Sequence, residues 1–147
     1  MQFVNAERRK TAKEEKIEQL RKIRWVDKYH TFHKIVPGVD DSSEEQKDAI
    51  NTIVEDCCTE LIRIYNGKKK PTKEKIKKTI LRYMDMISYA DVNTENKDFG
   101  YELCWYIGEK VGIDIRKYTK TKVYGYWSID NGKLKIINRR GKKPEKD

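Results

Sequence analysis

Apolar residues recur with a helical period between residues 50 and 64, and this repeat constrains the fold more than any other feature. Its members occupy the i, i+3, i+4, i+7, i+11 and i+14 positions of one helix face: Ile50, Ile53, Val54, Cys57, Leu61 and Ile64. Ser42 and Ser43 are alternative N-caps with capping-box spacing, and Asn66-Gly67 is a typical helix end. The segment therefore predicts a long helix that buries one side.

Three further segments predict helices that pack with this one. The first is a long charged helix over Glu7–Lys34, whose first dozen residues carry little to bury and are expected to fray. The second opens at Pro71-Thr72 with Thr72 as N-cap, and the third is capped by Thr94 and ends at Gly112. Their inner stripes include Ile17, Leu20, Ile23, Ile76, Ile80, Tyr83, Met84, Ile87, Phe99, Leu103, Tyr106 and Ile107.

The C-terminal part has the pattern of a β-hairpin. Two runs rich in aromatic and β-branched residues flank Asn131-Gly132, which is the strongest short hairpin signal. A two-residue loop there pairs Trp127 with Ile136 and Ile129 with Leu134, so these four side chains share one face. A lone hairpin is marginal in water, and we expect that face to pack on the helices.

These elements predict a mainly α fold, with four principal helices and a C-terminal β-hairpin packed on them. A single domain over residues 1–138 fits the length, and residues 139–147 have the composition of a disordered basic tail. We expect Trp105, Trp127 and the apolar cluster from Trp25 to Phe32 to close the core.

The charge is unevenly distributed along the chain. Lysine and arginine number 33 against 24 aspartates and glutamates, which gives a net charge of +9. By segment, the net charge is +4 over 1–40, −5 over 41–66, +6 over 67–90, −4 over 91–114 and +8 over 115–147. Adjacent helices of opposite sign can offset part of the repulsion. The surplus lies in Lys68–Lys78 and the C-terminal part, which indicates an anionic partner.

The cysteines and the apolar runs bear on the compartment. Cys57, Cys58 and Cys104 are an odd number with two adjacent members, a poor disulfide framework that favours the reducing cytoplasm. No apolar run is long enough to cross a membrane. The first ten residues lack the apolar core of a signal peptide, so a cytoplasmic protein is expected unless a signal segment has been removed.

Catalytic and metal-binding patterns are weak. Asp27, His30 and His33 lie near one helical face, but a partly exposed, structural or neutral role explains them better than a metal site does. Glu95, Asp98 and Glu102 could line a cleft beside Tyr101 or Trp105 as in a hydrolase, although Glu95 and Asp98 also suit a helix N-terminus. With no P-loop, GxGxxG or GxSxG motif, we predict no enzyme, no catalytic residue, no metal and no cofactor.

The order of several short motifs from Val36 to Trp127 resembles a small bacterial family catalogued as domain of unknown function 4844. The motifs are Val36-Pro37-Gly38-Val39, Pro71-Thr72-Lys73-Glu74, Thr94-Glu95-Asn96-Lys97, Glu102-Leu103-Cys104-Trp105-Tyr106, Val111-Gly112-Ile113 and Tyr124-Gly125-Tyr126-Trp127. The family tends to have an acidic residue at the position of Asn96. The resemblance implies a small, mostly helical domain and transfers no catalytic residue.

Two binding functions fit these features. The leading prediction is a protein-interaction module that meets an acidic protein partner, with an immunity-type or accessory role. The alternative is non-specific nucleic-acid binding, in which aromatic rings of the hairpin stack on bases and cations hold phosphates. Both use one candidate surface: Lys68, Lys69, Lys70, Lys122, Tyr124, Tyr126, Lys135, Arg139 and Arg140.

Overall fold

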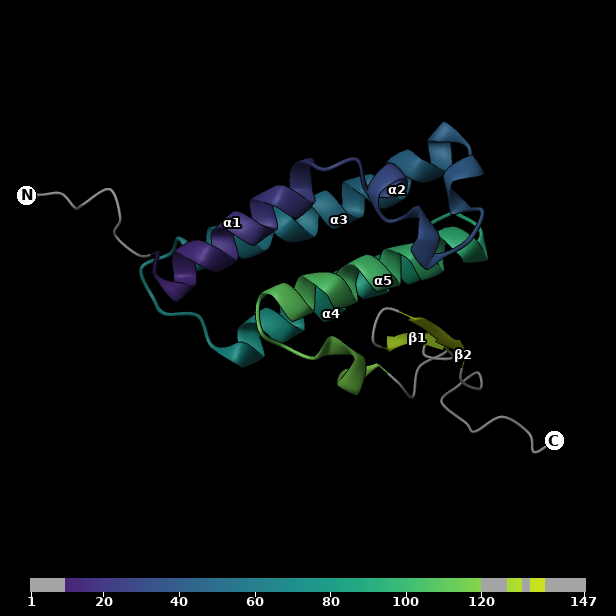
Figure 1. Ribbon diagram of the computed structural model, residues 1–147. Coiled ribbons are helices and arrows are strands. Elements are labelled where there is room, and N and C mark those ends of the chain that lie inside the picture. The colour runs from purple at the N-terminus through teal and green to yellow at the C-terminus, as the bar shows by residue number, and fades with distance from the viewer. Residues whose placement is uncertain (1–9, 120–126, 131–132, 137–147) are drawn as a thin grey trace, which may run out of the picture.

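The computed structural model describes residues 10–119, 127–130 and 133–136, and Figure 1 shows its elements. Residues 10–119 contain five α-helices: α1 (Ala12–Trp25), α2 (Lys28–Thr31), α3 (Glu44–Tyr65), α4 (Lys73–Ser88) and α5 (Thr94–Lys110). Short 3-10 helices lie between or after them: η2 (His33–Ile35), η3 (Val39–Asp41) and η4 (Ile115–Tyr118).

The four longer helices form a bundle with α3 at its centre. Helix α3 packs against α1, α4 and α5, while α5 also packs against α4 and α1. Sequential long helices run in opposite directions, as Figure 1 shows. Short loops join α3 to α4 and α4 to α5, whereas the longer segment 26–43, which contains α2, η2 and η3, joins α1 to α3. The starts of α1 and α4 therefore gather at the same end of the bundle as the ends of α3 and α5.

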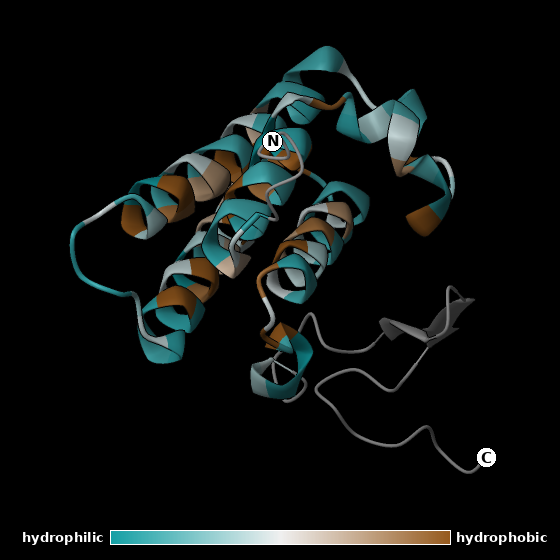
Figure 2. Ribbon diagram, turned by 60° about the vertical axis from the view of Figure 1, so that its left-hand side comes forward, coloured by the Kyte–Doolittle hydropathy of each residue, from teal (hydrophilic) through white to brown (hydrophobic). Residues whose placement is uncertain are grey.

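The predicted apolar stripe of residues 50–64 forms the centre of the core. Ile50, Val54, Cys57 and Leu61 are buried, as predicted, and Ile53 and Ile64 are partly buried. Hydrophobic and hydrophilic residues alternate along the long helices in Figure 2, and each of these helices has buried hydrophobic residues. Helix α5 departs from a one-sided pattern: Phe99 to Trp105 are all buried, so this helix is covered on every side.

Side-chain caps fix where the helices begin. Ser43, one of the two predicted alternatives, caps α3 by accepting a hydrogen bond from the Gln46 amide at 3.3 Å. Thr72 caps α4, as predicted, through the Lys75 amide at 3.0 Å. The prediction of Thr94 as a cap is wrong by one residue, because Asn93 accepts from the Asn96 amide at 2.9 Å.

The prediction of one helix over Glu7–Lys34 is wrong. Helix α1 ends at Trp25, and Val26 has an extended backbone with φ −73° and ψ 152°. Asp27 then caps α2 by accepting a hydrogen bond from the His30 amide. The Lys28 ammonium donates to the Arg24 carbonyl at 3.0 Å, so a lysine side chain stabilises the end of α1. Residues 1–9 of the expected helix lie outside the described residues.

The predicted fold class also needs correction. Residues 10–119 form an all-helical fold of five α-helices, rather than four helices closed by a packed β-hairpin. In the described part of the chain, the buried core comes from helices and their connections alone. The backbones of β1 (Trp127–Asp130) and β2 (Lys133–Ile136) pair antiparallel, with Trp127 opposite Ile136 and Ile129 opposite Leu134. The predicted packing of their side chains on the helices lies outside the described residues.

The expected aromatic closure of the core is only partly correct. Trp105 is buried, and its indole N–H donates to the Thr119 hydroxyl at 3.2 Å. Trp25, in contrast, is 75% exposed, because α1 ends there and turns its side chain away from the core. The side chain of Trp127 and the expected tail at 139–147 lie outside the described residues. No helix of the described chain is both long and apolar enough to cross a membrane.

Candidate functional site: a lysine-rich end and a polar pocket

Lysines gather where α3 ends and α4 begins. Helix α3 ends at Tyr65, and the loop that follows carries Lys68, Lys69 and Lys70, all of them exposed. Helix α4 adds Lys73 and Lys77, and η4 adds Lys117 from the chain beyond α5. We call these six residues the lysine-rich end: Lys68, Lys69, Lys70, Lys73, Lys77 and Lys117.

A shallow groove of about 290 Å³ lies within the lysine-rich end. Lys73, Glu74 and Lys77 of α4 line one side. The other side is lined by Gly112, Ile113, Asp114, Lys117 and Tyr118, so three lysines and two carboxylates surround the groove. The second side of the groove begins at Gly112, where the chain turns. The φ of Gly112 is 87°, a left-handed conformation that glycine adopts without strain. This turn brings η4 back against α4 and places the lysines of the two elements around the groove.

The ion pairs of α4 leave most of the lysine-rich end unpaired. Glu74 pairs with Lys77 at 3.0 Å and with Lys78 at 3.9 Å. Further along α4, Arg82 pairs with Glu60 of α3 at 2.6 Å, so the basic and acidic helices do meet there. Among the described residues, Lys68, Lys69 and Lys70 make no ion pair, and their charge faces solvent.

The dipole of α4 adds to this positive charge. The first turn of an α-helix carries a partial positive charge, which favours anions and disfavours cations. Lys73 and Lys75 nevertheless occupy the first turn of α4, with Glu74 the only acidic residue there. The local charge arrangement is thus unfavourable for the isolated helix and favourable for a bound anion.

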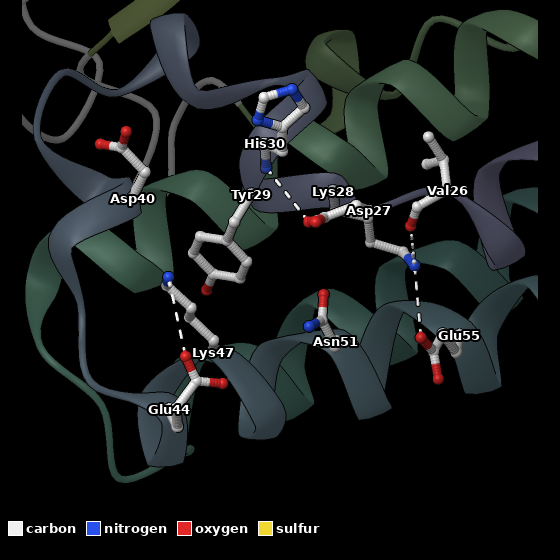
Figure 3. Close-up of a pocket in the computed structure, with 10 residues that line it drawn as sticks. All are labelled: Val26, Asp27, Lys28, Tyr29, His30, Asp40, Glu44, Lys47, Asn51 and Glu55. Atoms are coloured by element: carbon white, nitrogen blue, oxygen red, sulfur yellow. Dashed lines mark hydrogen bonds and ion pairs between the residues drawn. The ribbon is translucent and has the colours of Figure 1, made fainter.

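The opposite end of the bundle is acidic. Three helices begin there with acidic residues in the first turn: Asp40 and Asp41 of η3, Glu44 and Glu45 of α3, and Glu95 of α5. A polar pocket of about 530 Å³ opens at this end between the 26–30 segment, η3 and α3. Figure 3 shows its lining residues: Val26, Asp27, Lys28, Tyr29, His30, Asp40, Glu44, Lys47, Asn51 and Glu55.

The structure places only part of the predicted candidate surface. Lys68, Lys69 and Lys70 lie together on the exposed loop before α4. Lys135 belongs to β2, but its side chain lies outside the description. The remaining members also lie outside the described residues: Lys122, Tyr124, Tyr126, Arg139 and Arg140.

The Asp27, His30 and His33 group is engaged in local structure. Asp27 caps α2, and a ring nitrogen of His33 lies 2.7 Å from the His30 carbonyl oxygen. The two imidazole rings are 6.3 Å apart between centroids. Among the described residues, no three histidine, cysteine or acidic side chains come together in a way that could hold a metal ion.

The three carboxylates considered for a hydrolase differ in their surroundings. Glu95 is exposed, Asp98 is partly buried, and Glu102 is only 5% exposed. One oxygen of Glu102 is buried without a hydrogen-bond partner. Burial raises the pKa of Glu102 to about 8, with Arg116 opposing the shift and Asp98 adding to it. None of the three lines the pocket of Figure 3.

Sequence reasoning missed the pocket and its buried lysine. Lys28 is only 1% exposed, and its ammonium lies 3.4 Å from a carboxylate oxygen of Glu55. Asp27 three residues before a helical His30 is an N-cap signal that could have located the break after α1. The pocket itself has no local sequence signal, because its walls come from segments far apart in the chain.

No family model, no curated protein and no solved structure matches the chain. The resemblance to domain of unknown function 4844 stays a prediction.

Proposed function

We propose that the protein is a non-enzymatic binding protein whose lysine-rich end docks on an acidic protein partner. The observation that carries this proposal is that Lys68, Lys69 and Lys70, on one exposed loop, form no ion pair with any described residue. Such charges bring little stability to the fold, because exposed cations are well solvated. Their concentration beside the α4 N-terminus favours the approach of an anionic surface.

The groove supports a protein partner more than a nucleic acid. Non-specific nucleic-acid binding uses aromatic faces on which bases stack. Within the described part of the lysine-rich end, the exposed aromatic side chain is Tyr118, and the Lys77 ammonium lies 4.3 Å from its ring centroid. One face of that ring is therefore already engaged by a cation. An acidic peptide needs no free aromatic face to bind here; it needs only carboxylates spaced to match the lysines of the lysine-rich end.

The thiols support an intracellular setting for this binding. Cys57, Cys58 and Cys104 are buried and free, with no disulfide among them. Free cysteines are typical of reducing compartments, and we include the cytoplasm in the proposal.

Affinity purification from nuclease-treated bacterial lysate, followed by mass spectrometry, tests the proposal. The bait is the full chain, compared with a triple variant carrying Lys68→Gln, Lys69→Gln and Lys70→Gln. The expected result is an acidic protein that the wild-type chain retains and the triple variant loses.

A second triple variant, Arg21→Gln, Lys22→Gln and Lys34→Gln, is the matched control. It removes the same charge from exposed positions outside the lysine-rich end. Retention of the partner by this control ties binding to the loop rather than to net charge. Equal loss of the partner in both variants would contradict the proposal. So would nucleic acid as the main retained species in a parallel purification without nuclease.

A further inference from the structure

Two oxygen acceptors face the same space in the polar pocket. In Figure 3 the Asp27 carboxylate and the Asn51 side chain approach this space from opposite walls, from the 26–30 segment and from α3. One Asp27 oxygen accepts a hydrogen bond from the His30 amide at 3.2 Å. Within the described part of the chain, the Asn51 amide oxygen accepts no hydrogen bond, and its neighbours cover it, so a ligand reaches it when these side chains move aside. A buried acceptor without a donor is costly, so this position favours a ligand that donates hydrogen bonds.

The side wall of the pocket already accommodates a cation. The ammonium of Lys47 lies 5.6 Å from the centroid of the Tyr29 ring and 4.0 Å from a Glu44 oxygen. An aromatic face together with a carboxylate is a favourable setting for a positive group. Figure 3 shows Tyr29, Lys47 and Glu44 together on one side of the pocket.

Lys28 does not supply the missing donor. Its ammonium donates to the carbonyl oxygens of Arg24 at 3.0 Å and Val26 at 3.4 Å, and it pairs with Glu55 at 3.4 Å. These three contacts account for the three donors of an ammonium group. The acceptors at the centre of the pocket are left for a group from outside.

We propose that this pocket binds the guanidinium group of an arginine side chain from a basic protein segment. A guanidinium is a planar fork of five donors, so it can meet acceptors on opposite walls. Asp27, Asp40, Glu44 and Glu55 outnumber the two lysines of the lining, which gives the pocket the complementary charge. The exposed indole of Trp25, directly before the pocket segment, offers apolar contact to the chain that carries the arginine.

This site is independent of the proposed function. The lysine-rich end and the pocket lie at opposite ends of the bundle and bind groups of opposite charge. Together they make the chain a bridge between an acidic partner and a basic one, and each site can be tested by itself.

The test is a titration of the full chain with N-acetyl-arginine amide, followed through the NMR signal of the Asn51 side-chain amide. N-acetyl-citrulline amide, which keeps the shape of arginine and loses its charge, is the control ligand. The expected result is a saturable shift with arginine and none with citrulline. Asp27→Asn should weaken binding about fivefold to tenfold, because asparagine keeps the helix cap and loses the charge. Asn51→Asp, followed through the backbone amide of His30 that donates to Asp27, should tighten binding by a similar factor.

Asp48→Asn is the matched control variant. Asp48 is an exposed acidic residue of α3, the helix that carries Asn51, and it does not line the pocket. Its substitution should leave the dissociation constant unchanged. Three results would overturn the proposal. They are citrulline binding as tight as arginine binding, equal effects of Asp27→Asn and Asp48→Asn on the dissociation constant, and the absence of a saturable shift with arginine.

Discussion

The buried ammonium of Lys28 lies 3.4 Å from the half-exposed carboxylate of Glu55, and the pair ties the turn after α1 to the middle of α3. The same ammonium donates to the Arg24 carbonyl at the end of α1. One side chain therefore ends a helix and joins two elements that are far apart in sequence. This contact positions the 26–30 segment that forms one wall of the polar pocket.

Lys28→Met should lower the free energy of unfolding by about 1–3 kcal/mol, because it removes a charged donor from two backbone carbonyls while keeping the length of the side chain. Urea denaturation measures the change. Lys34→Met is the control at an exposed lysine, expected within about 0.5 kcal/mol of wild type. Equal stability of the two variants would show that the Lys28 contacts contribute nothing to the fold.

Gly108→Ala should destabilise the protein more than Gly100→Ala. A Cβ at Gly108 would lie 2.4 Å from the Ile115 side chain and 2.8 Å from the Ile113 carbonyl oxygen. The three atoms nearest to a Cβ at Gly100 all belong to the Ile87 side chain, whose δ-methyl group at 2.9 Å can rotate away. We expect a loss of about 1–3 kcal/mol at Gly108, which exceeds the gain of about 1 kcal/mol from alanine in a helix. Thermal denaturation of the pair checks the order, and the reverse order would refute the close approach of η4 to α5.

Asn96→Asp should strongly destabilise the bundle. Asn96 is fully buried; its amide nitrogen donates to Ser42, Gln46 and Asn93, and its amide oxygen accepts from the Tyr29 hydroxyl at 2.5 Å. A carboxylate there would lose the donors and bury a charge, which costs about 2 kcal/mol or more. Urea denaturation at neutral pH measures this loss in the free energy of unfolding. Wild-type stability of the variant would show that this network tolerates an acid.

The stability of the protein should fall as the pH rises through the titration of Glu102. Its pKa is about 8 in the fold against 4.5 for an ordinary glutamate. Between these two values the unfolded chain has released the proton and the folded chain keeps it, so raising the pH favours unfolding. Glu102→Gln should therefore gain stability over wild type from pH 5 to pH 8. The exposed Glu95→Gln should show no such trend, and a variant at Glu102 that loses stability at pH 8 would refute this account.

The three thiols should resist alkylation in the native protein. Cys57, Cys58 and Cys104 are fully buried, and burial raises the pKa of all three, that of Cys58 to about 12. Thiolate is the reactive form, so little of it is present at neutral pH. Iodoacetamide labelling, counted by mass spectrometry, should increase with urea in parallel with unfolding. Rapid labelling of one thiol in native buffer would contradict this burial.

The helical bundle was predictable because its signals are local. The apolar period of residues 50–64 and the cap at Thr72 depend on neighbours within one helix, and both were located correctly. The break after Trp25 has one local signal, the N-cap Asp27, but the Lys28 to Glu55 contact that stabilises it joins residues far apart in the sequence. The polar pocket was missed because its walls also come from segments far apart in the chain. Glu102 was singled out as a residue, but its burial depends on packing around α5 that no local pattern reports.

Direct comparison of two polyanions gives the sharpest test of the lysine-rich end. The full chain is titrated with poly-L-glutamate and with single-stranded RNA of equal charge at one salt concentration, and the dissociation constants are compared. We predict tighter binding of poly-L-glutamate. The triple variant at Lys68, Lys69 and Lys70 should weaken that binding about tenfold, as expected for three charge contacts of modest strength. Tighter binding of the RNA, or poly-L-glutamate binding that the triple variant leaves unchanged, would contradict the account.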